Sequence, residues 1–363
     1  MVFRVSVVDF EGDYAVSVAR ALQMVDWRPE VGASYLVKPN MLNSKTAQEG
    51  VTSDPGMVGA LVRLLREKSC RTFVGDSPGN AYPGKARSVF KSTGMMDAVL
   101  DSGGEFVDFE EQPPVIVDVG GILVHSVPFS RHVLENRIIN VPKLKTHIQT
   151  VMTGAVKNLA FGCIQGASKS KLHSIGNTPE KMAKAITDVY AYLRSKVEVN
   201  LMDAIVCMDG NGPSYGKPRV LSKILASKDA LALDIVAFSM AGVDPSSVPY
   251  VREGMERGLG PSSVDEIEIL GDPLPNCKFR LPSTFVASLS LKFAPWLSPF
   301  GPRVSIDKKL CTRCGECAGI CPENAIVIRN YPEIETSKCI RCYACYEVCE
   351  FNAVKVRKLA ILL

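Results

Sequence analysis

Eight of the twelve cysteines lie close together in the last part of the chain, and their spacing is suited to holding metal. The segments CTRCGECAGIC and CIRCYACYEVC share the spacing C-x2-C-x2-C-x3-C and begin 28 residues apart. This spacing wraps three thiolates around one iron–sulfur cubane, and the fourth cysteine reaches the other cubane. The sequence therefore predicts two [4Fe–4S] clusters, held by Cys311, Cys314, Cys317 and Cys349 (cluster 1) and by Cys339, Cys342, Cys345 and Cys321 (cluster 2).

Zinc is the alternative occupant, because thiolates also bind zinc well. Structural zinc sites use separated cysteine pairs, however, whereas triplets in this rhythm fit cubanes. The remaining cysteines are scattered singly at positions 70, 163, 207 and 277, and a disulfide framework is not expected in so large a chain without an export signal. Clusters with no open coordination site move single electrons, so any further chemistry is expected elsewhere in the chain.

The stretch VPKLKTHIQTVMTGAVKNLAFG, residues 141–162, is a second group of chemically active residues. No aspartate or glutamate occurs from Asn136 to Pro179, although the composition of the whole chain would place about four or five in these 44 residues. The cations of this basic segment are Arg137, Lys143, Lys145, Lys157, Lys169 and Lys171. Cations without acidic partners gather where an anion binds, and the apolar residues between them favour burial over the alternative, a solvated basic surface.

Several side chains in and around this segment are assigned roles. We expect His147 and Lys157 to be catalytic, with His147 handling protons. A ligand bearing phosphate, carboxylate or a nucleotide would be bound by Lys143, Lys145, Asn158, Asp76, Asp209 and His173. Gly154 could also open a helix whose N–H groups face the anion. A hydrogen-bonded histidine without a role in chemistry is the alternative for His147 and for His173.

Strand-like and helix-like runs alternate through the first 280 residues. The runs that read as buried strands are RVSVVD, SYLVKPN, RTFVGDS, RIINVPKLK, VNLMDAIVCMDG and RVLSKILAS. Helices are expected from Asp54-Pro55 to about Ser69, from Thr178-Pro179 to about Lys196, and from about Asp229 to Gly242. Alternation of this kind predicts an α/β domain with a mainly parallel sheet. Because most of these strands end in polar residues, we expect their carboxyl ends to converge on one site.

The expected organisation is an α/β ligand-binding domain over residues 1–280, a proline- and aromatic-rich linker over 281–302, and a small α+β ferredoxin-like domain over 303–358. A net charge of +4 does not suggest nucleic acid as a partner. No apolar run is long enough to span a membrane, and the first residues lack the pattern of a signal peptide, so a cytoplasmic location is expected.

Two resemblances bear on function. The C-terminal segment resembles bacterial-type ferredoxins with two [4Fe–4S] clusters, except that Glu350 stands where the family has proline after the last cysteine. The runs GDSPGNAYPGK, VPKLKTHIQTVMTGAVKNLAFG and MDGNGPSYGKPR resemble the prokaryotic family catalogued as domain of unknown function 362, which implies an iron–sulfur protein but no particular reaction. More distantly, the order of His147, Lys157 and His173 is similar to that in nickel-pincer lactate racemases.

Three functional hypotheses follow. The leading one is an iron–sulfur redox protein, an oxidoreductase whose ferredoxin-like domain exchanges electrons with an anionic ligand, or a redox partner protein, bound by the α/β domain. The second is a non-catalytic cofactor carrier or assembly factor for a partner enzyme. The third is an isomerase with a nickel-nucleotide cofactor, as the racemase resemblance implies.

Overall fold

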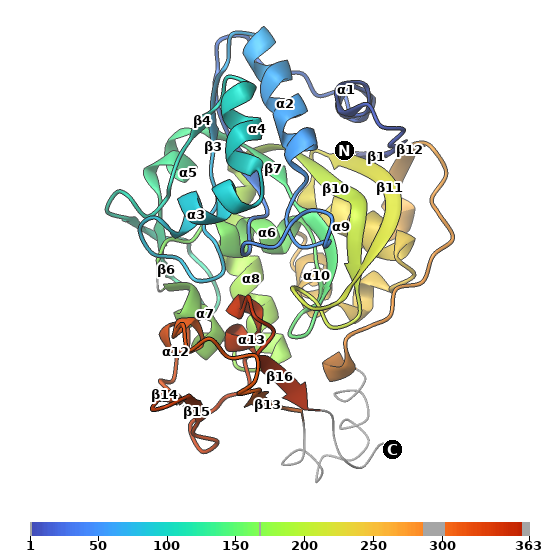
Figure 1. Cartoon of the computed structure of the whole chain (residues 1–363). Helices are drawn as coiled ribbons and strands as arrows, with labels where there is room; N and C mark the ends of the chain where they lie inside the picture. Colours follow the sequence, from blue (N-terminus) through green and yellow to red (C-terminus); the bar gives the residue numbers. More distant parts are fainter. Residues whose placement is uncertain (1, 167, 286–301, 358–363) are drawn as a thin grey trace.

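The computed structural model describes residues 2–166, 168–285 and 302–357. Figure 1 shows a large body of sheet and helices, with the C-terminal segment, in red, packed beneath it. The linker expected over 281–302 therefore lies mostly outside the described residues. The domain limits at 280 and 302 stay predictions.

Ten strands of the described chain form one mixed sheet, in which β8 and β9 lie off the main path. They are β1 (Phe3–Asp9), β2 (Ser34–Pro39), β3 (Arg71–Val74), β4 (Glu105–Phe106), β7 (Arg137–Val141), β8 (Lys143–His147), β9 (Val151–Thr153), β10 (Val197–Asp209), β11 (Lys217–Ser227) and β12 (Ile267–Gly271). The path runs β12-β1-β11-β10-β7-β2-β3-β4. Strands β10, β7, β2, β3 and β4 are parallel, while β11 runs antiparallel to both β1 and β10. The prediction of an α/β domain with a mainly parallel sheet is confirmed.

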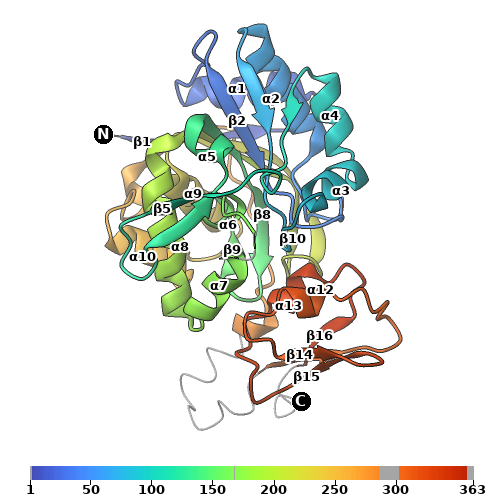
Figure 2. The same cartoon turned by 90° about the vertical axis from the view of Figure 1, so that its left-hand side faces the viewer.

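Helices cover both faces of the sheet (Figures 1 and 2). One buried cluster unites the sheet with α1 (Tyr14–Met24), α2 (Pro55–Glu67), α3 (Lys85–Ser92) and α4 (Met95–Asp101). A second cluster unites the other face with α5 (Arg131–Glu135), α6 (Ala155–Gly162), α7 (Ser168–Ile175), α8 (Pro179–Leu193), α9 (Ala230–Met240) and α10 (Pro249–Glu256). A separate hairpin is formed by β5 (Val115–Asp118) and β6 (Ser126–Phe129).

The three helices expected from the sequence begin where their capping residues predict. Asp54, Thr178 and Asp229 each accept a hydrogen bond from a backbone N–H in the first turn, as N-cap side chains do. Proline follows the cap directly in α2 and α8, where its missing N–H removes no helical hydrogen bond. The helix predicted to reach Lys196 ends at Leu193 and continues as a 3-10 turn.

The C-terminal part is built on two copies of one backbone pattern. Its elements are β13 (Arg303–Ile306), α12 (Glu316–Gly319), β14 (Ile326–Ile328), β15 (Pro332–Ile334), α13 (Ala344–Val348) and β16 (Val354–Arg357). Left-handed backbone recurs at matched positions of the two cysteine segments: Arg313 and Arg341, Gly315 and Tyr343, Asn324 and Asn352. The N–H of Ala325 donates to Cys321 Sγ at 3.2 Å, and that of Ala353 donates to Cys349 Sγ at 3.3 Å. The repeat in the sequence is therefore a repeat in three dimensions.

Acidic side chains of the C-terminal part hold it against the large domain. Glu316 accepts hydrogen bonds from Asn80 and Tyr82, and Glu323 accepts one from Ser174. Glu350 accepts a hydrogen bond from Ser44 at 3.0 Å and pairs with Lys85 at 3.4 Å. The glutamate that replaces the ferredoxin proline thus makes an interdomain contact.

Candidate functional site

The cysteines predicted for cluster 1 surround one small cavity. Cys311, Cys314, Cys317 and Cys349 all line a space of about 20 Å³ between α12 and the start of β16. Burial, together with the nearby Cys314, Cys349 and Cys311, raises the pKa of the Cys317 thiol to about 11. Four thiol donors around one space fit a four-iron cluster, which such ligands hold as thiolates.

The cysteines predicted for cluster 2 also lie near one another. Burial raises the pKa of Cys345 well above its ordinary value, and the nearby Cys342, Cys317, Cys339 and Cys321 act in the same direction. Within the described residues, no three His, Cys, Asp or Glu side chains are placed to hold a single metal ion.

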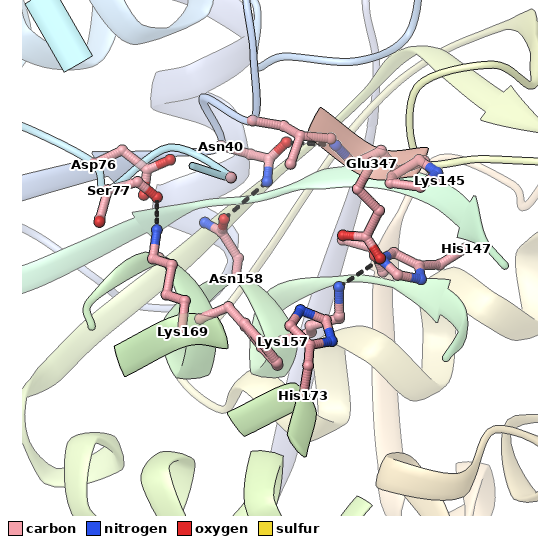
Figure 3. A pocket seen from close by; sticks show the side chains of 16 residues that line it. Asn40, Asp76, Ser77, Lys145, His147, Lys157, Asn158, Lys169, His173 and Glu347 are labelled. Carbon is pink, nitrogen blue, oxygen red and sulfur yellow. Dashed lines mark hydrogen bonds and ion pairs between the residues drawn. The ribbon is translucent and has the colours of Figure 1, made fainter. Parts of the chain in front are cut away.

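A second cavity, of about 70 Å³, lies where α13 meets the carboxyl ends of the parallel strands. Most of the residues predicted to bind a ligand line it: Asp76, Lys145, His147, Lys157, Asn158 and His173. Lys169 and Glu347 line it as well, and Figure 3 shows Glu347 of the C-terminal part reaching towards His147 and Lys157. We call this space the interdomain cavity.

Three buried lysines of this cavity contact neutral groups. Lys145 Nζ donates to Asn40 Oδ1 and to the carbonyl of Val51, both at 2.7 Å. Lys169 Nζ donates to the carbonyls of Ser77 and Pro78. Lys157 Nζ lies 2.6 Å from His147 Nε2. Within the described part of the chain none of the three forms an ion pair with a carboxylate, and Lys145 and Lys169 can offer charge-assisted hydrogen bonds to a bound anion.

Burial shifts the pKa values of the histidine and lysine side chains that line the cavity. It lowers the pKa of His147 and of His173 to about 4, so both rings are neutral near pH 7. Burial also lowers the pKa of Lys145, Lys157 and Lys169. For Glu347, burial alone would raise the pKa, but the adjacent His147 lowers the pKa, and the carboxylate stays ionised.

Two buried polar atoms that line the cavity, Thr153 Oγ1 and His173 Nδ1, have no hydrogen-bond partner in the described structure. A third, Glu347 Oε1, lies 3.3 Å from His147 Nε2. A buried polar atom left unpaired costs about 1–3 kcal/mol, so such atoms are normally paired with water or a ligand. These atoms face one space, in which water or a polar ligand would pair with them.

Two residues predicted for this site lie elsewhere. Lys143 does not line the cavity, because its Nζ pairs with Asp203 Oδ2 at 2.8 Å and both side chains are fully buried. Asp209 lies outside because β10 runs on into a hairpin with β11, where Asp209 pairs with Arg280 at 3.1 Å and with Arg219 at 3.5 Å. The expectation that the strand ends converge also fails for the run RVLSKILAS, because β11 is antiparallel to β10 and its last residue, Ser227, lies at the opposite edge of the sheet.

The first N–H groups of α6 do not face the interdomain cavity, contrary to the expectation for Gly154. The N–H groups of Ala155 and Val156 donate to Asp234, at 2.5 and 3.1 Å. A Cβ atom on residue 154 would overlap the Asp234 carboxylate, which explains the glycine. Asp76 lines the cavity, but both of its carboxylate oxygens already have partners within the protein. Oδ1 pairs with Lys38 at 2.7 Å, and Oδ2 accepts a hydrogen bond from the N–H of Met41.

Sequence reasoning missed Glu347 and gave Lys169 no role in the site. Glu347 lies between Cys345 and Cys349, so its neighbours in the sequence suggested only cluster binding. Lys169 was counted among the cations of the basic segment, and its place in α7 puts its amine beside Ser77.

These features define the class of the protein: an α/β domain with a mainly parallel sheet, joined to a part whose cysteines are suited to two iron–sulfur clusters. The chain belongs to the family described as domain of unknown function (DUF362), whose model matches residues 36–239, and this confirms the resemblance. Residues 303–350 match the 4Fe-4S dicluster domain, which identifies an iron–sulfur electron-carrying protein with two [4Fe–4S] clusters.

A thylakoid-associated protein of Synechocystis sp. is 30% identical over 241 residues. The match covers 64% of this chain and 71% of that protein. Among the described residues, no helix is both long and apolar enough to cross a membrane.

Proposed function

We propose that the protein transfers electrons to or from a small anionic molecule bound in the interdomain cavity. One observation carries the proposal: Glu347, which lines the cavity beside the buried lysines, stands on α13 between a predicted ligand of cluster 2 and a predicted ligand of cluster 1. A molecule in the cavity therefore lies against the helix that connects both cluster sites. When bound, the clusters supply single electrons.

Different residues of the cavity are proposed to bind the anion and to transfer protons. Lys145 and Lys169 hold the anionic group by charge-assisted hydrogen bonds, and Asn158 adds an amide. His147 moves protons, because its Nε2 lies 2.6 Å from Lys157 Nζ and 3.3 Å from Glu347 Oε1. The residues around Glu347 exclude bulk water and so strengthen these interactions.

Anaerobic purification followed by ligand titration tests the proposal. We expect about eight irons per chain, and binding of acetate or phosphate by calorimetry that shifts the midpoint potential of a cluster. Lys145→Met and Lys169→Met should weaken binding at least tenfold, whereas Lys171→Met, which removes an exposed lysine of the same basic segment, should not. Equal binding by all three variants would refute the anion site. Nickel in the purified protein would instead support the isomerase hypothesis, and iron without anion binding would support the assembly factor.

Anion binding should weaken as the pH rises through about 8. Burial, with a smaller effect of Lys38, lowers the pKa of Lys169 to about 8, although Asp76, Glu110 and Cys163 partly oppose the shift. The amine is therefore charged below this pH and neutral above it, and a bound anion raises its pKa, so binding near pH 8 takes up protons. Acetate is a suitable probe because its own charge is constant in this range. Calorimetry in two buffers of different ionisation enthalpy should show the uptake, and Lys169→Met should reduce it; an unchanged affinity from pH 6 to 9 would contradict this role.

The partner protein that exchanges electrons with cluster 1 is proposed to be acidic. Cys314 is exposed, and beside it in the sequence lie the exposed Lys308, Lys309 and Arg313. The acids Glu316, Glu323 and Glu350 instead face the large domain. The outer surface near cluster 1 therefore carries positive charge, which steers an acidic partner and speeds its association.

Reversing these charges should slow electron transfer from an acidic flavodoxin about tenfold or more at low salt. The variant combines Lys308→Glu, Lys309→Glu and Arg313→Glu, and stopped-flow absorbance of the clusters gives the rate. Reduction by dithionite should be unchanged, and so should the flavodoxin rate after Lys68→Glu and Lys91→Glu, which reverse two exposed charges on the large domain. A flavodoxin rate that is the same for both variants would exclude this surface.

A further inference from the structure

Backbone contacts fix the tautomer of His147. The N–H groups of Gln149 and Thr150 both point at His147 Nδ1, at 3.1 and 3.4 Å. A nitrogen that accepts hydrogen bonds carries no proton, so the proton of the neutral ring is on Nε2.

This tautomer determines the protonation state of the Lys157 amine. Its Nζ lies only 2.6 Å from His147 Nε2, which already carries a hydrogen. A charged ammonium has no lone pair to accept that hydrogen, whereas a neutral amine has one. The contact with Phe161, whose ring centre is 5.0 Å from Nζ, does not require charge, since a neutral N–H can also point at a ring. Burial, which lowers the pKa of Lys157, acts in the same direction.

We propose that Lys157 is a neutral amine nucleophile that forms an imine with a small carbonyl compound carrying a carboxylate, such as a 2-oxo acid. Desolvated lysines of this kind attack carbonyl carbon. Lys145 and Lys169 line the same cavity and can donate hydrogen bonds to the carboxylate. The cavity volume of about 70 Å³ admits a molecule of only a few heavy atoms. The inference rests on the proposed function and names the chemical class of its ligand.

The step balances without an oxidant or reductant. The lone pair of Nζ attacks the carbonyl carbon, one amine proton moves to the oxygen, and a carbinolamine results. Loss of the hydroxyl group with a second nitrogen proton releases one water and leaves the carbon–nitrogen double bond. His147 Nε2–H, 2.6 Å from Nζ, is placed to donate a proton to the departing hydroxyl and to recover one from nitrogen.

Reductive trapping tests the inference on the intact holoprotein. Glyoxylate and cyanoborohydride, added anaerobically, should fix the imine as a stable secondary amine that peptide mass spectrometry locates. We expect Lys157 to be modified at least ten times faster than the exposed Lys308. Propanal, which lacks the carboxylate, should show no such preference, and Lys157→Arg should abolish the fast modification while retaining iron and helical circular dichroism.

Acetate binding separates the two proposals. If Lys157 reacts no faster than Lys308 while acetate still binds in a manner that depends on Lys145 and Lys169, the imine is refuted and the anion site stands. If neither fast modification nor acetate binding is seen, both fail. Acceleration that is equal for propanal and glyoxylate would refute the carboxylate as the recognised group.

Discussion

Replacing Lys143 with methionine is expected to destabilise the large domain by about 3–5 kcal/mol. Its Nζ lies 2.8 Å from Asp203 Oδ2, and both side chains are fully buried. Methionine fills a similar volume but leaves the Asp203 carboxylate in the interior without its cation. The penalty arises from that uncompensated charge, more than from the lost attraction.

Urea denaturation followed by circular dichroism under anaerobic conditions measures this effect as a lowered midpoint. The double variant Lys143→Met with Asp203→Asn should recover most of the loss, because the amide needs no counter-charge and its oxygen can still accept from the N–H of Asp54 or of Ile205. Lys171→Met is the matched control, since Lys171 belongs to the same basic segment but is exposed. Equal midpoints for Lys143→Met and Lys171→Met would contradict a structural role for the pair.

The same pair shows where reasoning from the sequence reaches its limit. The absence of acids between Asn136 and Pro179 is real, but it describes only neighbours along the chain. The partner of Lys143 comes from β10, 60 residues further on, where strand pairing places Asp203 opposite it. Charge balance in a folded protein is set by contacts between distant segments, which local composition does not report.

Other parts of the site could be predicted because they depend on local periodicity. Lys145 and His147 are two residues apart in β8, so they face the same side of the strand, and both line the interdomain cavity. Asp76 follows the parallel strand β3 and reaches the same edge. Asp209 ends β10 as the run VNLMDAIVCMDG predicts, but it lies outside the cavity, because the hairpin of β10 with β11 could not be inferred from the residues at the strand end.

The contribution of Glu347 could not be predicted, because it depends on how the two parts of the chain pack. Its main-chain carbonyl accepts hydrogen bonds from Ser214 at 3.1 Å and from Asn43 at 3.4 Å, and the hydroxyl of Tyr346 donates to the carbonyl of Asn211 at 2.8 Å. These contacts anchor α13 and so direct the carboxylate into the cavity. The site is therefore a property of both parts together.

Replacing Cys345 with alanine is expected to remove cluster 2 and to open the interdomain cavity. Cys345 is buried at the start of α13, between the cluster site and the contacts that anchor this helix to the large domain. In so small a structure, metal binding provides much of the folding free energy. Iron should fall from about eight to about four per chain, limited proteolysis should begin between the two parts, and acetate binding should be lost with Glu347 displaced.

Two further variants serve as controls for the Cys345→Ala result. Cys277→Ala removes a cysteine of the large domain that belongs to neither ligand set, and should keep all the iron. Cys314→Ala removes the exposed ligand of cluster 1, and should lower the iron content to a similar extent while α13 and acetate binding are retained. Retention of about eight irons by Cys345→Ala would overturn its assignment as a ligand. Only the Cys345 substitution acts directly on α13, the helix that carries Glu347. If the Cys314 and Cys345 variants lose acetate binding equally, the cavity depends on the whole C-terminal part and not on α13 in particular.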